Sequence, residues 1–270
     1  MSSATSNIEI ILSELDEDGI LRLTLNDPSR HNALSEAMLE KLKITLDIAS
    51  RNASVRVIVL AANGPTYCAG HDLKEITAGR TAPDMGHEYF SYIMNMCSNA
   101  MQAIVTCKKP VIAEITGIAT AAGCQLVASC DLAIADSSAK FSTPGVNIGL
   151  FCSTPMVALS RNVSNKHALE MLLTGEMISA RRAMDFGLIN SAVETEALRD
   201  NVMNLARKIA SKSSATVAIG KAAFYTQREM NLSDAYKYAS EVMIQNLLTS
   251  DASEGISAFI EKRKPQWKDK

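Results

Sequence analysis

Hydrophobic positions in the first two thirds of the chain form short apolar runs, separated by turns and by helix-like patterns. Residues 8–12 and 20–25 flank a turn-rich Asp-Glu-Asp-Gly segment, which predicts a β-hairpin. The apolar, β-branched run 57–61 predicts a buried strand, and residues 110–115 predict another. Shorter strands are expected at 132–135 and 140–142. Helix-like stretches separate several of these strands, so the order predicts an α/β protein with a parallel sheet.

Helix-like spacing of apolar residues dominates elsewhere. Ser35 is a favourable N-cap residue, and Leu39, Leu42 and Leu46 follow it at intervals of three and four, which predicts a helix. From Ser153 onward the pattern is helical, with Ser153 as a predicted N-cap. Other helices are expected at 84–106, 198–209, 214–230, 233–248 and 253–263. We therefore expect a core over residues 1–195 and a helical oligomerisation region over residues 196–270.

Composition narrows the classes of function. The chain has 270 residues, 47% of them hydrophobic, with 27 basic and 29 acidic side chains. With a net charge of -2, the chain has no overall excess of basic residues, so nucleic acid is not an expected partner. No apolar stretch is long enough for a membrane span and no signal sequence is visible, so no membrane partner is expected. The expected location is cytoplasmic, or the mitochondrial matrix if a transit peptide has been removed.

The six cysteines do not form a recognisable metal motif. No C-x-x-C pair occurs, and the four histidines do not cluster with the cysteines. Structural zinc sites usually have such spacing, so no metal is expected. We interpret the cysteines as buried, reduced thiols, including Cys68 and Cys124. A nucleophilic thiol beside His71 is the second interpretation.

Two glycine-containing turns are the candidate site of chemistry. They cover residues 67–75 and 117–126, and each lies between a predicted buried strand and a helix. Small residues let the backbone approach a ligand closely, and N–H groups at a helix start lack internal partners. Two such turns can direct two donors at one oxygen, which is an oxyanion hole. Taken singly, either turn is more typical of tight packing, and neither has the G-x-G-x-x-G spacing of a dinucleotide site.

In this order and spacing, the two turns resemble those of the enoyl-CoA hydratase/isomerase (crotonase) superfamily. The resemblance extends from residue 8 to residue 267 and includes His-Asn-Ala-Leu at 31–34 and Thr-Gly-Glu at 174–176. Residues 121–131 and 143–155 are similar to one group within it, the enoyl-CoA hydratase domain-containing protein 3 group. The resemblance implies a crotonase (ClpP/crotonase-like) fold, which is a β/β/α spiral core with a C-terminal helical trimerisation region. It also implies homotrimers, or hexamers formed by pairing them.

Family roles transfer to this sequence by position. The two oxyanion-hole N–H groups would come from the backbone of His71 and Ala122. An acyl-CoA thioester is the implied ligand, and no cofactor is expected beyond its CoA part. Phe259 and Lys262 match a pair that reaches the CoA of a neighbouring subunit. The other residues implied to surround the substrate are Arg30, Ala33, Ala69, Gly70, Asp72, Lys74 and Gly123.

Two positions depart from the family pattern. Hydratases place glutamates where this chain has Gln125 and Gly145. A glutamine does not accept a proton at neutral pH, and a glycine has no side chain. Because each general acid–base group contributes about 10²–10⁴-fold to a rate, the residues predict little hydration of an enoyl-CoA. Two functions stay open: an enzyme that stabilises an acyl-CoA enolate, with decarboxylation as one such reaction, and a protein that binds acyl-CoA without turnover.

Side chains near the turns have simpler interpretations as well. We expect His71 to contribute its backbone and to carry an exposed ring, with general-base chemistry of the ring as the alternative. Asp72 is expected to cap the helix that follows it. The acyl pocket is expected to be lined from residues 76–96, with three tyrosines as candidates for either the pocket or the core: Tyr67, Tyr89 and Tyr92. A serine peptidase of related fold is disfavoured, because no Ser–His–Asp order fits the sequence.

Overall fold

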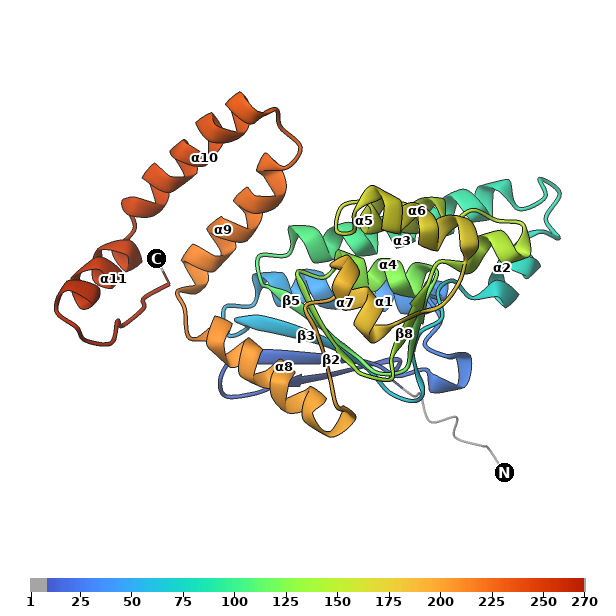
Figure 1. The fold of residues 1–270 in the computed structure, drawn as a ribbon, viewed down its shortest axis with the longest axis horizontal. Helices are drawn as coiled ribbons and strands as arrows, with labels where there is room; N and C mark the ends of the chain where they lie inside the picture. The colour runs from blue at the N-terminus through green and yellow to red at the C-terminus, as the bar shows by residue number, and fades with distance from the viewer. Residues whose placement is uncertain (1–8, 270) are drawn as a thin grey trace.

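Ten strands form two sheets in the part of the chain that the computed structural model describes, residues 9–269 (Figure 1). The strands are β1 Ile11–Leu15, β2 Ile20–Leu25, β3 Val57–Ala62, β4 Thr66–Cys68, β5 Val111–Ile115, β6 Ile118–Thr120, β7 Leu132–Asp136, β8 Lys140–Ser142, β9 Ile178–Ser179 and β10 Ser191–Val193. One sheet has the order β1-β2-β3-β5-β7-β10, and the other has the order β4-β6-β8-β9.

Helices cover both sheets and continue beyond them at the C-terminal end (Figure 1). The α-helices are α1 Glu36–Arg51, α2 Leu73–Gly79, α3 His87–Thr106, α4 Ala122–Ser129, α5 Ser153–Leu159, α6 Asn165–Thr174, α7 Ala180–Phe186, α8 Thr195–Ala210, α9 Ser214–Gln227, α10 Leu232–Leu247 and α11 Ser250–Ile260. Two 3₁₀ turns, η1 Pro28–Arg30 and η2 Pro144–Ile148, precede α1 and α5. Within the described residues, no helix is long and apolar enough to cross a bilayer.

Successive strands alternate between the two sheets. The chain passes from β3 to β4, from β5 to β6 and from β7 to β8, each time leaving the six-stranded sheet for the four-stranded one. Apart from the β1–β2 hairpin and the β8–β9 pair, the strand pairs within each sheet are parallel. Each turn of the chain thus adds one strand to each sheet and then a helical segment, which confirms the predicted β/β/α spiral.

The alternation of buried residues along β3 explains how the six-stranded sheet is packed. Ile58 and Leu60 belong to the main core with residues of α1 and α3, whereas Val57 and Val59 pack with residues of α8 on the opposite face. Side chains along a strand point alternately to its two faces, so a strand covered on both sides must be apolar throughout. Ser35 caps α1 by accepting a hydrogen bond from the Met38 N–H, as predicted.

Several elements differ from the sequence-based expectation. The three-residue strands β4 and β6 replace predicted turn segments, and β9 and β10 interrupt a region predicted as helical. The first predicted strand began at residue 8, which lies outside the described residues, and the hairpin strand starts at Ile11. Ser153 is not an N-cap. It is the first residue of α5 after Cys152, and its hydroxyl donates to the Phe151 carbonyl.

The three last helices extend away from the sheets as an arm, α9 to α11 (Figure 1). A largely buried ion pair holds the arm to the core, because Lys221 Nζ of α9 lies 2.7 Å from Asp131 Oδ2. Tyr225 donates to the other Asp131 oxygen at 2.9 Å. Helix α8 packs on the sheet through its own apolar face, and the predicted division at residues 195 and 196 stays a prediction.

Candidate functional site

The first glycine-containing turn follows β4 and is fixed by the loop before α1. The Ala69 N–H donates to the His31 carbonyl at 3.1 Å, and the Leu34 N–H donates to the Gly70 carbonyl at 2.7 Å. Buried Asn32 holds this loop in place, since its side-chain amide donates to the Thr66 carbonyl at 2.7 Å. Gly70 has a φ of +88°, which favours glycine, and His71 follows as the next residue.

The second turn joins β6 to α4. Ala121 adopts φ 52° and ψ -121°, an unusual backbone conformation for alanine, and its N–H donates to the Ser142 carbonyl of β8 at 3.0 Å. This conformation directs the chain into α4, whose first residue is Ala122. The first N–H groups of a helix have no intrahelical acceptor, so the Ala122 N–H is available to a ligand.

The two turns are in direct contact. A Cβ atom added to Gly70 would lie 2.9 Å from Ala121 Cβ and 3.0 Å from the Ala122 nitrogen. A Cβ atom added to Gly123 would lie 2.0 Å from the Cys68 carbonyl oxygen. Glycine at both positions therefore allows the start of α4 to press against the end of β4.

The backbone N–H groups of His71 and Ala122 are the unpaired donors at this contact. Within the described residues, no hydrogen bond from either N–H is present. Each N–H group belongs to the residue that directly follows a contact residue: His71 follows Gly70, and Ala122 follows Ala121. Two donors held by such closely packed backbone have the arrangement expected of an oxyanion hole.

The two positions where hydratases carry glutamates offer no acid. Gln125 is buried on α4, and its side-chain oxygen accepts a long contact of 4.0 Å from the Cys97 thiol. Gly145 is enclosed: an added Cβ would lie 2.9 Å from both Cys152 Sγ and the Leu150 carbonyl oxygen. The backbone around Gly145 is thus closed over the space that a glutamate side chain would need.

The ring of His71 is not exposed, contrary to the expectation from sequence. Both ring nitrogens are buried, and within the described residues neither has a hydrogen-bond partner. Burial lowers the pKa of His71, while the Leu34 backbone near the ring acts in the opposite direction. The buried hydroxyl of Thr143, which follows β8, has no partner in the described structure either. Sequence reasoning missed Thr143, because a threonine before a proline carries no signal of burial.

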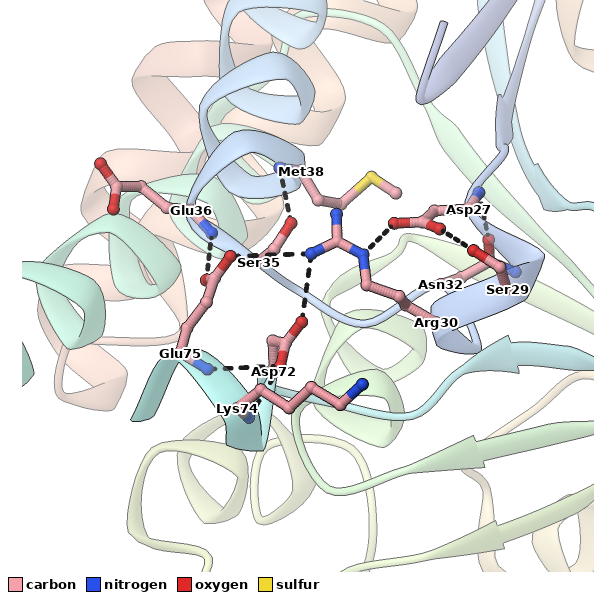
Figure 2. Close-up of polar contacts among 10 residues, drawn as sticks. All are labelled: Asp27, Ser29, Arg30, Asn32, Ser35, Glu36, Met38, Asp72, Lys74 and Glu75. Atoms are coloured by element: carbon pink, nitrogen blue, oxygen red, sulfur yellow. Dashed lines mark hydrogen bonds and ion pairs between the residues drawn. The ribbon is translucent and has the colours of Figure 1, made fainter. Parts of the chain in front are cut away.

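Asp72 does not add a free carboxylate to the site (Figure 2). Its Oδ1 accepts hydrogen bonds from the Lys74 and Glu75 N–H groups, which confirms the predicted cap of α2. Its Oδ2 accepts from Arg30 at 3.2 Å, and Arg30 also pairs with Asp27 at 2.7 Å. Both side chains are therefore occupied within the protein.

Lys74 is the uncommitted cation beside this cluster. Figure 2 shows its side chain pointing away from Asp72, with its ammonium group joined to none of the residues drawn. Lys74 is exposed, and no ion pair of Lys74 is present among residues 9–269. By contrast, the Arg30 guanidinium is held by Asp27, Asp72 and Glu75, whose charges outweigh the effect of burial and raise its pKa. A phosphate group near α2 would thus meet Lys74 as the freely available charge.

The cysteines near the turns have the properties of inert thiols. Burial raises the pKa of Cys68 and of Cys124 to about 12 in each case. Burial also raises the pKa of Cys152, which accepts a hydrogen bond from the Gly145 N–H. Thiols are nucleophilic as thiolates, so these cysteines are poor nucleophiles at neutral pH. Among the described residues, no group of three or more metal-binding side chains is present.

A cavity of about 410 Å³ lies beside α4. Its wall includes Gln125, Ala128 and Ser129 of α4, which are one and two turns beyond Ala122. The remaining wall comes from α3, α5 and the segment after α5, and α9 with the residues that follow it: Ser98, Met101, Gln102, Val105, Thr106, Thr154, Val157, Ala158, Arg161, Asn162, Tyr225, Arg228 and Glu229. Residues 76–96, which we expected to line the pocket, do not contribute to this cavity. Tyr67 is part of the core, where its hydroxyl donates to the Leu60 carbonyl.

Phe259 and Lys262 lie far from the two turns in the same chain. Phe259 lies in the last turn of α11 and Lys262 just after it, and Figure 1 places α11 at the opposite end of the molecule from α2. Phe259 is 85% exposed. Their predicted contact with the CoA of a neighbouring subunit stays a prediction, and within one chain they do not meet His71 or Ala122.

Comparison with known proteins assigns the architecture to a family. The family model described as enoyl-CoA hydratase/isomerase matches residues 16–270. The chain belongs to the enoyl-CoA hydratase/isomerase family. The family resemblance expected from the two turns is thereby confirmed.

Relatives within the enoyl-CoA hydratase/isomerase family include members of the predicted group. Enoyl-CoA hydratase domain-containing protein 3, mitochondrial, from Rattus norvegicus is 48% identical over 257 residues, covering 95% of this chain and 84% of that protein. Its Homo sapiens counterpart is 47% identical over 250 residues, covering 93% and 81%. The similarity to this group is thus confirmed for almost the full chain.

Solved structures of the family have the same fold. An enoyl-CoA hydratase from Mycobacterium smegmatis superposes with a TM-score of 0.92 at 49% identity, covering 96% of this chain and 99% of that chain. The human enoyl-CoA hydratase domain-containing protein 3 superposes with a TM-score of 0.90 at 45% identity, covering 96% and 100%. The crotonase fold predicted from the sequence is confirmed.

Proposed function

We propose that this protein binds an acyl-CoA thioester and polarises its carbonyl with the backbone N–H groups of His71 and Ala122. The observation that carries the proposal is the pair of unpaired amides on two turns that touch through Gly70 and Ala121. Backbone donors that are fixed before the ligand arrives stabilise a negative oxygen without reorganising. The carbonyl oxygen of a thioester becomes such an oxygen when an enolate forms.

The reaction that we propose is enolate chemistry other than two-carboxylate hydration. The side chain of Gln125 does not act as an acid or a base at neutral pH, and the space at Gly145 is closed by Cys152 and Leu150. Decarboxylation suits such a site, because the C–C bond to the leaving carboxylate supplies the electron pair of the enolate. The same absence of carboxylates favours the second candidate function, which is binding of acyl-CoA without turnover.

We place the acyl chain in the cavity along α4. Ala122 and Gln125 are three residues apart on this helix and share a face, and Ala128 and Ser129 continue that face into the cavity wall. Six residues of helix span about 9 Å, so the cavity extends away from the proposed carbonyl position over the length of a medium acyl chain. Apolar side chains from three helices, including Met101 and Val157, suit such a chain.

The CoA part of the ligand is proposed to lie against the first turn and α2. Lys74 offers a free ammonium group for a phosphate, whereas Arg30 shapes the loop through its carboxylate partners. Ala33, Ala69 and Gly70 would contribute backbone contacts. We propose no cofactor beyond the CoA part of this ligand.

We propose that the arm formed by α9 to α11 mediates a homotrimer or a hexamer. Many large apolar side chains of the arm are exposed in the single chain, which favours a subunit interface over contact with water. The most exposed of them are Phe224, Leu232, Tyr236, Met243, Leu247, Leu248, Phe259 and Ile260. In such an assembly Phe259 and Lys262 would reach the ligand of a neighbour.

A mitochondrial matrix location is proposed in place of a cytoplasmic one. The rat and human relatives carry the word mitochondrial in their names. Acyl-CoA chemistry in that compartment is compatible with six free thiols in the described structure.

Replacing one backbone amide by an ester tests the oxyanion hole directly. Incorporation of lactic acid at position 122 removes the N–H and keeps the methyl side chain. We expect binding of butyryl-CoA, measured by calorimetry, to weaken at least about tenfold, and any turnover to fall about 10²–10³-fold. The same exchange at Ala180, the first residue of α7, is the matched control and should leave binding unchanged. Unchanged binding with the ester at position 122 would contradict the proposal.

A further inference from the structure

We propose that the imidazole of His71 is the proton-transfer group of this site. The ring removes a proton from the carbon next to the thioester carbonyl and later returns one, while the His71 and Ala122 N–H groups hold the enolate oxygen. This inference rests on the proposed function, because it requires an acyl-CoA at the two turns. It adds a catalytic side chain to a site that otherwise consists of backbone donors.

The first observation is the state of the ring itself. Both ring nitrogens of His71 are buried and have no hydrogen-bond partner within residues 9–269. Buried polar groups in folded proteins are nearly always hydrogen-bonded, so an exception calls for a functional explanation. The Leu34 backbone lies near the ring and raises its pKa, yet neither ring nitrogen forms a hydrogen bond of normal geometry. A histidine that only filled space in the core would be expected to bond at least one nitrogen with normal geometry to a carbonyl or a hydroxyl.

The second observation is that the other such group lies at the same site. Thr143 Oγ1 is buried and without a partner in the described structure. Strands β6 and β8 pair Thr120 with Ser142, and Ala121 donates to the Ser142 carbonyl, so Thr143 follows next to the turn that presents Ala122. The unpaired buried side chains of the described structure are therefore His71, in the first turn, and Thr143, which directly follows the strand residue that holds the second turn.

Covalent geometry keeps the ring near the reacting atoms. The imidazole belongs to the residue whose N–H would bind the carbonyl oxygen, so bond lengths place its nitrogens within about 6 Å of that amide nitrogen. A hydrogen-bonded carbonyl oxygen lies about 3 Å from the same nitrogen, and the α-carbon is two bonds from that oxygen. In the proposed complex the ring faces the acyl group, and these distances allow the α-hydrogens to reach it.

Other side chains of the two turns are poor candidates for this role. Asp72 caps α2 and pairs with Arg30, and the thiols of Cys68 and Cys124 have pKa values raised to about 12 by burial. Gln125 does not titrate. Burial favours the neutral form of the His71 ring, which is the form that accepts a proton.

The proposed step is balanced without a further reactant. The α C–H bond breaks, its proton moves to a ring nitrogen, and its electron pair forms the enolate, whose negative oxygen accepts from the two N–H groups. The reverse step returns a proton from the ring. In heavy water the ring exchanges its proton with solvent, so the ligand gains deuterium at the α-carbon without any net reaction.

Deuterium exchange into butyryl-CoA tests the proposal. The full-length protein is incubated with butyryl-CoA in heavy water, and the mass of the ligand is followed with time. We expect α-exchange by the wild-type protein and a loss of at least about 100-fold in His71→Asn, with the dissociation constant changed less than about threefold. Exposed His87 at the start of α3 provides the control, and His87→Asn should exchange at the wild-type rate.

A rescue experiment separates catalysis from structure. His71→Ala leaves the backbone donor in place and removes the ring, so added imidazole should restore part of the exchange. Exchange by His71→Asn at the wild-type rate would overturn the inference, and so would butyryl-CoA binding by the wild-type protein without any α-exchange. In both cases the proposed acyl-CoA binding would stand. Absence of butyryl-CoA binding by the wild-type protein would instead overturn the proposed function.

Discussion

Gly70 lies so close to Ala122 that a single added carbon would come within 3.0 Å of the Ala122 amide nitrogen. The spacing of the two proposed oxyanion donors is thus set by a glycine that precedes one of them and touches the other. Any side chain at this position must push the turns apart or cover the Ala122 N–H.

We therefore predict that Gly70→Ala weakens butyryl-CoA binding by at least about tenfold. The change should also lower the free energy of unfolding by about 1–3 kcal/mol, because it overpacks a buried contact. Calorimetric titration and chemical denaturation measure the two effects.

Gly149 provides a matched control for Gly70→Ala. Its φ of +77° is similar to the +88° of Gly70, yet an added Cβ would meet nothing within 4 Å. Gly149→Ala should carry the backbone strain alone, about 1 kcal/mol, and leave binding intact. Equal losses of binding in both variants would mean that the contact with Ala122 is unimportant.

Restoring the hydratase glutamates is predicted to fail at one of the two positions. Gly145→Glu should destabilise the fold by more than about 1–3 kcal/mol, because its first side-chain carbon would already lie 2.9 Å from Cys152 Sγ and the Leu150 oxygen. Gln125→Glu has an existing side-chain space and should fold. Neither variant is expected to hydrate crotonyl-CoA, and an absorbance assay that detects hydration by Gly145→Glu would contradict the closed geometry.

The link between core and arm should depend on Lys221. Its side chain is 7% exposed, and its ammonium group also donates to the carbonyls of Ile104 and Lys109. Lys221→Met leaves the Asp131 carboxylate largely buried without its cation, which should cost about 3–5 kcal/mol in thermal or chemical denaturation.

An exposed ion pair supplies the control for Lys221. Lys43 and Asp47 lie 2.7 Å apart one helical turn from each other, with side chains that are 44% and 39% exposed. Lys43→Met should change the free energy of unfolding by about 0.5 kcal/mol or less. If both lysine variants lose the same stability, the buried pair does not hold the arm.

His71 should make the protein less stable in weak acid. Burial lowers its pKa below the ordinary value of about 6.5, so the unfolded chain binds the proton more readily than the folded one. Stability from this group is present above about pH 6.5 and is lost as the pH falls below that value.

The acid effect can be assigned by comparing melting temperatures between about pH 7.5 and about pH 5.5. His71→Asn should show a smaller decrease over this range than the wild-type protein, whereas His87→Asn should follow the wild type. An identical decrease in the wild type and His71→Asn would show that the ring does not titrate as proposed.

Local sequence patterns predicted the longer elements of this fold and the two turns. The continuous apolar run in β3 indicates a strand that is covered on both faces, and the spacing of Leu39, Leu42 and Leu46 follows the helical period of α1. Strands β4 and β6 have three residues each, which is too short for a period to be read.

Properties that depend on distant segments could not be predicted from the sequence. The ring nitrogens of His71 are buried by the packing of other elements although the residue itself is partly exposed, and its position in a loop gave no sign of this. The cavity beside α4 takes part of its wall from Tyr225 and Arg228, about 100 residues later in the chain. Gly145 is enclosed by Cys152 because the chain folds back locally, and a glycine in the sequence does not predict this fold-back.

Binding and hydration of crotonyl-CoA by one sample of the wild-type protein distinguish a site with two free donors and no carboxylate from a hydratase. Calorimetry measures binding of the thioester, and loss of the conjugated enoyl absorbance measures its hydration. The two free N–H groups at His71 and Ala122, together with Gln125 and Gly145 in place of glutamates, predict saturable binding with negligible hydration. Hydration at about 10 s⁻¹, the median turnover of enzymes, would contradict this prediction, and so would a failure of crotonyl-CoA to bind.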